Sequence, residues 1–231
     1  STPKVGGSID ITSFPNLTSF ACESNDITSF TASEPSPSLL NLSLSGNKLT
    51  DIINLPAFQN LTNYNVRYNA LTGEVPALDN NPNLKYFDAY SNKLTKINSL
   101  SGATNLVEFK VTLNALSGSI PDLSNNILLE TFLVDQNPSL SGPLPSLSSN
   151  VNLKEFYADL TNVSGTVPTL DYNPNLSVFT CYGTALSGNL PSIANNPLMN
   201  YFRLGPRSTA SPYRFSGTIP TFGDNNNLTF Y

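Results

Sequence analysis

The sequence contains no histidine and no tryptophan, and charged side chains are scarce. Its 231 residues include 11 Lys and Arg and 16 Asp and Glu, which gives a charged fraction of 12% and a formal net charge of -5. The absence of His removes Ser–His and Cys–His nucleophiles and the commonest metal ligand. A protein that binds nucleic acid through its phosphates needs a clustered Lys/Arg surface. We therefore expect no enzymatic activity, no cofactor and no nucleic-acid partner.

Cysteines and long apolar runs are also scarce. The two cysteines, Cys22 and Cys181, lie seven repeats apart in the pattern described below, or about 34 Å at the ~4.8 Å spacing of neighbouring strands. A disulfide requires about 7 Å or less between Cα atoms, so we expect two core thiols. No apolar run approaches the ~18 residues of a membrane span, and the first residues include neither Met nor the apolar core of a signal peptide. We expect a soluble chain without membrane insertion, either a processed product or an excerpt.

The chain is dominated by internal repetition. An apolar residue recurs every 22 to 24 residues, with a last interval of 29. Phe, Tyr or Leu follows it three residues later, and a smaller apolar residue comes two residues after that in most repeats. A fixed period in this range indicates a solenoid, whose units each bury an apolar edge against their neighbours. The ten repeats begin at Leu17, Leu39, Leu61, Leu84, Leu106, Leu129, Leu153, Leu176, Met199 and Leu228.

Two columns of Asn accompany the apolar positions. We expect both to be structural, because a buried side-chain amide satisfies backbone groups that tight turns leave unpaired. The first column is Asn25, Asn47, Asn69, Asn92, Asn114 and Asn137, continued by Thr161 and Thr184. The second column is Asn81, Asn126, Asn150, Asn173, Asn196 and Asn225.

The pattern LxxLxLxxNxL, with Phe replacing the second Leu in most repeats, resembles the leucine-rich-repeat family from residue 17 to 231. The second halves of many repeats read LTGEVP (71–76), LSGSIP (116–121) or LSGNLP (186–191), which is similar to the LxGxIP plant-type and related microbial subclass. The resemblance implies a leucine-rich-repeat solenoid with one curved parallel sheet on its concave face. Its convex side would consist of turns, 3₁₀ and extended segments with little α-helix, and prolines in the return path exclude a long helix there.

We expect a single array with an irregularity at each end. Residues 1–16 are predicted to form an N-terminal cap strand, and residues 17–231 about nine to ten repeats without a recognisable C-terminal cap. The end is then an excerpt boundary or a surface that docks on a neighbouring subunit. The Gly-x-x-Pro is missing at residues 50–52 and 95–97, so those outer turns should differ in shape. A loop insertion is either a tolerated one or a contact loop that carries Arg207, Tyr213 and Arg214.

The concave face is the predicted binding surface. Alternate side chains of each strand point away from the core, and stacking the repeats arranges them in three columns. Tyrosines, carboxylates and a few cations on these columns are typical of a recognition surface. The alternative is that strand propensity alone favours Tyr and Thr on an open face. The predicted ligand-binding residues are Tyr86, Asp88, Tyr90, Lys110, Asp135, Tyr157, Asp159, Tyr182, Tyr201 and Arg203.

Three carboxylates in these columns are candidates for catalysis or metal binding. Asp135 and Asp159 occupy neighbouring repeats, with Glu155 beside them. Paired carboxylates serve glycoside hydrolysis, or bind Ca²⁺ with added oxygen ligands. An open sheet offers no means to raise one pKa. We expect solvated carboxylates, with a calcium site as the weaker alternative and no other metal.

The leading hypothesis is a non-catalytic recognition or adhesion module on a cell or virion surface, which binds a protein or glycan of a host or partner through its concave face. The Phe-rich repeat is similar in style to arrays of marine microbes and their phages, where they resemble adhesins on tail fibres or capsids. Two alternatives stay open. One is a structural virion or filament component assembled by end-to-end or lateral stacking, and the other is a secreted inhibitor or receptor ectodomain. All three imply an extracellular or virion-surface location.

Overall fold

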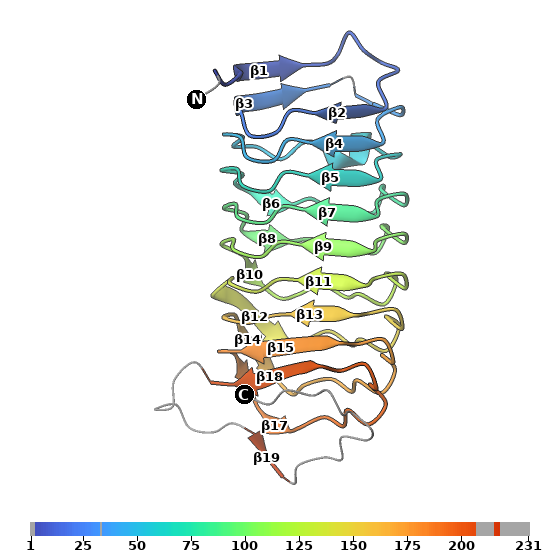
Figure 1. Cartoon of the computed structure of the whole chain (residues 1–231), viewed down its shortest axis with the longest axis vertical. Helices are drawn as coiled ribbons and strands as arrows, with labels where there is room; N and C mark the ends of the chain where they lie inside the picture. Colours follow the sequence, from blue (N-terminus) through green and yellow to red (C-terminus); the bar gives the residue numbers. More distant parts are fainter. Residues whose placement is uncertain (1–2, 33, 207–214, 218–231) are drawn as a thin grey trace.

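The chain winds into a parallel β-solenoid (Figure 1). The structure is a computed structural model that describes residues 3–32, 34–206 and 215–217. Each turn of the solenoid contributes one strand to a continuous ladder, as the repeat predicts. No helix of these residues is long and apolar enough to cross a bilayer.

The main sheet has nine parallel strands, and neighbours in the sheet are neighbours in the repeat. Its register follows the repeat, since Phe87 of one strand pairs with Phe109 of the next, and Phe109 with Phe132. The predicted columns are therefore confirmed. The strands are β2 (Ser19–Ala21), β4 (Asn41–Ser43), β5 (Asn63–Asn65), β7 (Tyr86–Asp88), β9 (Glu108–Lys110), β11 (Thr131–Leu133), β13 (Glu155–Tyr157), β15 (Val178–Tyr182) and β18 (Tyr201–Gly205).

The return path contains further short parallel ladders, where we expected turns and extended segments beside a single sheet. The glycine of the LxGxIP motif takes a left-handed conformation, as at Gly165 with φ of 83°, and lets the chain turn there. The largest ladder joins β10 (Ser117–Gly118), β12 (Ser139–Pro143), β14 (Asn162–Gly165) and β16 (Ala185–Leu186). Two-stranded ladders join β6 (Glu74–Val75) with β8 (Lys96–Ile97), and β17 (Gly188–Asn189) with β19 (Phe215–Ser216).

The two repeats that lack Gly-x-x-Pro behave differently. After residues 50–52 the chain forms η1 (Leu55–Ala57), a 3₁₀ helix with Pro56 in its first turn and the only helix of the described residues. Residues 96–97 instead form β8 and keep the ladder with β6. The expected change of shape is found at the first site, whereas strand pairing persists at the second.

Stacked aromatic rings fill the core behind the main sheet. From Phe87 to Phe202, successive rings of neighbouring turns lie 5.0 to 5.9 Å apart between centroids, with interplanar angles of 13° to 23°. Phe at this position buries more apolar area than Leu, and each ring pair adds about 0.5–1.5 kcal/mol. The Phe-rich pattern thus gives a continuous aromatic stack along the solenoid.

The first Asn column links each turn to the one before it. Asn69 donates through Nδ2 to the carbonyls of Leu44 (2.9 Å) and Val66 (3.0 Å), and its Oδ1 accepts from the backbone N–H of Leu49 (3.0 Å). Asn47, Asn92, Asn114 and Asn137 repeat this arrangement. The structural role predicted for these residues is confirmed. Thr161 replaces Asn with a single bond within its own turn, from Oγ1 to the carbonyl of Ala158 (2.7 Å).

The second Asn column is satisfied only on its donor side. Asn81 donates to the carbonyls of Leu55 (2.8 Å) and Phe58 (3.2 Å) of the preceding turn. Its buried Oδ1 has no partner among the described residues, and neither has that of Asn126, Asn150, Asn173 or Asn196. Asn225 lies outside the described residues.

The cysteines are both free, and they differ in burial. Cys181 is fully buried, and burial raises the pKa of its thiol, with the Asp159 charge adding to the shift. Cys22 is only half-buried, because it follows β2 at the edge of the main sheet. The expected core thiol is found at Cys181 but not fully at Cys22.

Strand β1 (Gly6–Asp10) lies at one end of the stack (Figure 1). It pairs in parallel with β3 (Asp26–Thr31), which belongs to the return path, and not with β2 of the main sheet. The segment predicted as a cap strand thus extends the return-path side of the solenoid, not the main sheet. Residues 218–231, which hold the last repeat and the C-terminal end, lie outside the described residues.

Candidate functional site

The outward face of the main sheet carries the predicted columns in register. Tyr86 of β7 pairs with Glu108 of β9, and Asp88 pairs with Lys110. Further along the sheet, Tyr157 pairs with Thr180, which in turn pairs with Arg203. The predicted residues therefore form a first group at β7 and β9 and a second group at β13, β15 and β18, with Asp135, just after β11, between them.

The first group surrounds a shallow hollow of about 290 Å³ that we call the tyrosine hollow. It is lined by Arg67, Tyr68, Asp88, Tyr90, Lys110 and Leu133. Three of these residues, Asp88, Tyr90 and Lys110, belong to the predicted site. The other three were not predicted as site residues, although Arg67 and Leu133 stand in the outward columns.

Tyr68 reaches the hollow because of a left-handed backbone conformation. Its φ is 54°, and the same position is left-handed in every turn from Ser24 to Gly183, whatever the side chain. A left-handed residue with a side chain costs roughly 1–2 kcal/mol. Tyr68 is nevertheless 54% exposed, and its ring meets the edge of Tyr90 at 5.1 Å between centroids. The available sequence signal was the Gly found at this position in two repeats, Gly46 and Gly183.

The hollow contains charges of both signs. Asp88 accepts the backbone N–H of Tyr90 at 3.0 Å. Burial raises the pKa of Asp88, while that hydrogen bond and the charges of Arg67 and Lys110 oppose the shift. Lys110 also forms an ion pair with Glu108. An incoming group therefore meets a half-buried carboxylate, two cations and the exposed ring of Tyr68.

The second group lies on β13, β15 and β18. The guanidinium of Arg203 sits 3.8 Å from the ring centroid of Tyr182, a cation–π geometry. Asp159 accepts from Thr180 Oγ1 (2.5 Å) and from the backbone N–H of Tyr182 (2.6 Å). Burial raises the pKa of Asp159 despite these bonds. The expectation that the open sheet cannot raise a carboxyl pKa, and that this carboxylate is fully solvated, is therefore wrong at Asp159. Partial burial and the carboxylates of the same face also raise the pKa of Tyr157.

The three carboxylates of the candidate calcium site do not converge. Asp135 accepts from Thr112 Oγ1 (2.5 Å) of the preceding turn, whereas Asp159 is bonded to the following turn. The two carboxylates therefore turn in opposite directions, and Glu155 completes no site with them. Across the described ranges, no group of three or more His, Cys, Asp or Glu has the geometry to hold a metal ion.

Of the remaining predicted residues, one lies on the main sheet and three lie outside the described residues. Tyr201 lies on β18 beside Val178 of β15. Arg207, Tyr213 and Arg214, proposed from the sequence as a contact loop, lie outside the described residues.

Comparisons with known proteins identify structures of similar fold but no relative by sequence. No protein-family model matches the sequence, and no curated protein matches it either. Two solved structures with strong similarity are plant receptors. The ectodomain of the Arabidopsis receptor kinase HAESA with an N-terminally extended IDA peptide hormone has a TM-score of 0.76 and 27% identity, over 88% of this chain and 36% of that chain.

The second is the ectodomain of the Arabidopsis thaliana receptor kinase GASSHO1/SCHENGEN3 in complex with CASPARIAN STRIP INTEGRITY FACTOR 2. It has a TM-score of 0.74 and 21% identity, over 93% of this chain and 29% of that chain. The chain thus spans about a third of the length of these receptor chains. A plant ice-binding protein is also similar, with a TM-score of 0.68 and 20% identity over 96% of this chain and 73% of that chain.

Both receptors are leucine-rich-repeat ectodomains, and the aligned region covers nearly all of the chain. The similarity supports the leucine-rich-repeat assignment, and the fold of this chain is a leucine-rich-repeat solenoid.

Proposed function

We propose that this chain is a non-catalytic binding module that holds a polypeptide on the outward face of its main sheet, with the tyrosine hollow as the anchor point. The hollow carries this proposal because aromatic and charged side chains surround a concavity there. A ligand strand that crosses the turns here would contact residues of four successive strands.

The chemistry of the hollow suits a polypeptide. Tyr68 and Tyr90 present broad rings with few rotatable bonds, so they give large contact area at low entropic cost. Arg67 and Lys110 supply hydrogen-bond donors, and Asp88 supplies an acceptor. The left-handed conformation is shared by this position in all eight turns, and at Tyr68 it brings an exposed ring to the hollow, where the ring is available to a ligand.

The similar receptors also support a polypeptide ligand. The HAESA ectodomain was solved with a peptide hormone, and the GASSHO1 ectodomain with its integrity factor. We extend polypeptide binding to this chain on the basis of its hollow. We also propose that the chain belongs to the LxGxIP subclass and is displayed outside a cell or on a particle. Glycan recognition and stacking into a fibre are the alternative functions, and the experiment below separates them from peptide binding.

The experiment screens the purified chain against a surface-displayed peptide library and a glycan array. Tyr68→Ala and Tyr90→Ala should each weaken binding of the selected peptides by at least about tenfold, as expected for truncation of an aromatic anchor. Tyr172→Ala is the matched control, because Tyr172 is similarly exposed at 56% but lies in a turn of the return path.

Three results would contradict the proposal. Selected peptides that bind both hollow variants as well as the wild type would move the site elsewhere. Hits on the glycan array alone would replace the polypeptide with a sugar. Concentration-dependent end-to-end oligomers, with no ligand in either screen, would favour a structural component.

A further inference from the structure

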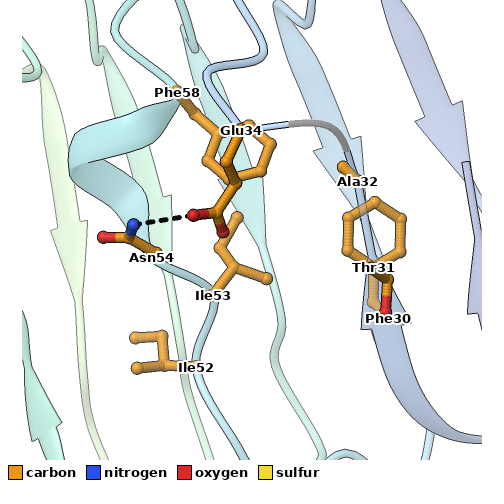
Figure 2. A pocket seen from close by; sticks show the side chains of 8 residues that line it. All are labelled: Phe30, Thr31, Ala32, Glu34, Ile52, Ile53, Asn54 and Phe58. Carbon is orange, nitrogen blue, oxygen red and sulfur yellow. Dashed lines mark hydrogen bonds between the residues drawn. The ribbon is translucent and has the colours of Figure 1, made fainter. Parts of the chain in front are cut away.

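A small cavity of about 230 Å³ lies between β3 and the segment that leads into η1 (Figure 2). It is separate from the tyrosine hollow and shares no residue with it. One wall comes from β3 and the residues after it, and the other from the second repeat. The lining residues are Phe30, Thr31, Ala32, Glu34, Ile52, Ile53, Asn54 and Phe58.

The cavity exists because the return path is not paired at this point. Strand β3 pairs with β1, and no backbone hydrogen bond among the described residues joins 28–32 to 50–54. Tyr64 replaces the usual core Phe or Leu, and its buried hydroxyl is hydrogen-bonded to the backbone of Ile53. This bond holds Ile53 toward the core, and η1 follows immediately.

The backbone of β3 directs polar groups into the gap. Thr31 faces β1, since its carbonyl accepts from the N–H of Ile11 at 2.9 Å. Successive residues of a strand direct their backbone groups to opposite edges, so Phe30 directs its N–H and C=O away from β1. Within the described chain these two groups have no hydrogen-bond partner. An unpaired strand edge is a ready site for a polar contact.

The accessible lining of the cavity is mostly polar, and it carries a negative charge. Phe30, Ile52 and Ile53 supply its smaller apolar part, and Figure 2 shows the Glu34 carboxylate beside Ile53 and Asn54. Asn54 Nδ2 donates to Glu34 Oε2 at 3.0 Å and fixes that side chain. The other carboxylate oxygen has no partner among the described residues. None of the eight lining residues is Lys or Arg, so the negative charge is not neutralised within the cavity.

We propose that this cavity binds the side chain of a lysine from a partner polypeptide. A lysine has a four-carbon apolar stem and an ammonium group with three donors. The stem lies against the apolar part formed by Phe30, Ile52 and Ile53, while the ammonium meets the free oxygen of Glu34 and the carbonyl of Phe30. The chemistry requires both parts, because a carboxylate without apolar walls or an apolar notch without a charge would not select lysine.

The test uses the whole chain with ¹³C-labelled Ile methyl groups and three probes. These are a blocked Ala-Lys-Ala peptide, the same peptide with norleucine in place of Lys, and n-butylammonium. The lysine peptide should shift the Ile52 and Ile53 methyl signals and saturate. The norleucine peptide keeps the stem but lacks the charge, so it should bind about tenfold more weakly or worse.

Two variants complete the design. Glu34→Gln should weaken lysine-peptide binding by about tenfold without unfolding the chain, because Glu34 is exposed. Glu74→Gln is the matched control, since Glu74 also accepts from an Asn amide, Asn98 Nδ2 at 2.9 Å, but lines none of the cavity. It should leave the affinity unchanged.

The proposal is overturned if the lysine peptide produces no shift of these methyl signals, if the norleucine peptide binds equally well, or if Glu34→Gln changes nothing. Tighter binding of n-butylammonium than of the lysine peptide would also overturn it, because the site would then serve a small free amine. A loss of affinity in both Glu variants would point to general electrostatic attraction instead of the cavity.

Discussion

Arg203 stacks on Tyr182 across two neighbouring strands of the main sheet, with its guanidinium carbon 3.8 Å from the ring centroid. Both side chains are half-buried. A cation–π pair at such a site contributes about 0.5–1 kcal/mol. A double-mutant cycle with Arg203→Met and Tyr182→Leu, measured by urea unfolding, should therefore give a coupling energy in that range. Additive single effects would mean that the two residues do not interact in solution.

In the aromatic stack, replacing a ring with Ala should destabilise the fold far more than replacing it with Leu. Phe132→Ala removes a ring packed between Phe109 and Phe156, and the cavity it leaves should lower the free energy of unfolding by about 3–5 kcal/mol. Phe132→Leu should cost much less, because Leu42 occupies the same column. Thermal and urea unfolding measure both variants. Equal losses would contradict the view that the column needs apolar volume more than ring stacking.

Replacing an Asn of the first column should lower the stability of the solenoid substantially. Asn137→Ala leaves the carbonyls of Val111 and Val134 and the N–H of Leu116 without their partner. Each buried unpaired group costs about 1–3 kcal/mol, so a total loss above about 2 kcal/mol is expected. Asn137→Thr should recover part of it, because Thr161 makes one such bond in its own turn. A Thr variant no more stable than the Ala variant would refute this role for the hydroxyl.

Asp88 should make the chain less stable as pH rises. Burial holds the pKa of its carboxyl above the ordinary value of 3.8 in the folded state. The folded state then binds the proton more tightly than the unfolded state, so the contribution of Asp88 favours folding at low pH and is lost as pH rises through the folded pKa. Asp88→Asn should remove this loss, and its stability gain over the wild type should grow from acid toward neutral pH.

Asp122 provides the control of opposite sign. Its carboxylate accepts from the hydroxyl and the backbone N–H of Ser124, and these bonds lower its pKa. Its contribution to stability is present at neutral pH and lost as pH falls through the lowered pKa. Asp122→Asn should therefore differ from wild type mainly above that range and in the destabilising direction. The same sign for both variants across the pH series would contradict the assignment.

The main sheet and its face were predictable because one period fixes them. Once the spacing of the repeats is known, the neighbour of Tyr86 must be Glu108, and the strand alternation sends both outward. The aromatic stack and the first Asn column follow from the same arithmetic. No long-range information beyond the repeat is needed for any of these features.

The tyrosine hollow was only partly predictable. Tyr68 stands after the strand, where alternation no longer applies and a left-handed turn decides where the ring points. Its pairing with Tyr90 therefore depends on a backbone angle, which the column pattern does not encode. The calcium alternative failed for a similar reason, since hydrogen bonds from Thr112 and Thr180 draw Asp135 and Asp159 apart.

The cavity beside β3 was not predictable from the repeat at all. It arises where the repeat is irregular, and it depends on β3 choosing β1 as its neighbour. The absence of Gly-x-x-Pro predicted a change of shape at two sites. Only the three-dimensional pairing decides that one of them opens a gap while the other, at Lys96–Ile97, stays closed in a ladder.

The replacement of Asn by Thr at Thr161 and Thr184 bears on how the solenoid comes apart. In the earlier turns the Asn side chain both donates to and accepts from the backbone of the preceding turn. The Thr hydroxyls instead donate to the carbonyls of Ala158 and Cys181 in their own turns. A repeat array is governed by the coupling between neighbours. The links at Thr161 and Thr184 are therefore weaker than those made by Asn, and amide exchange should be faster in these two turns than in the turns from Asn47 to Asn137.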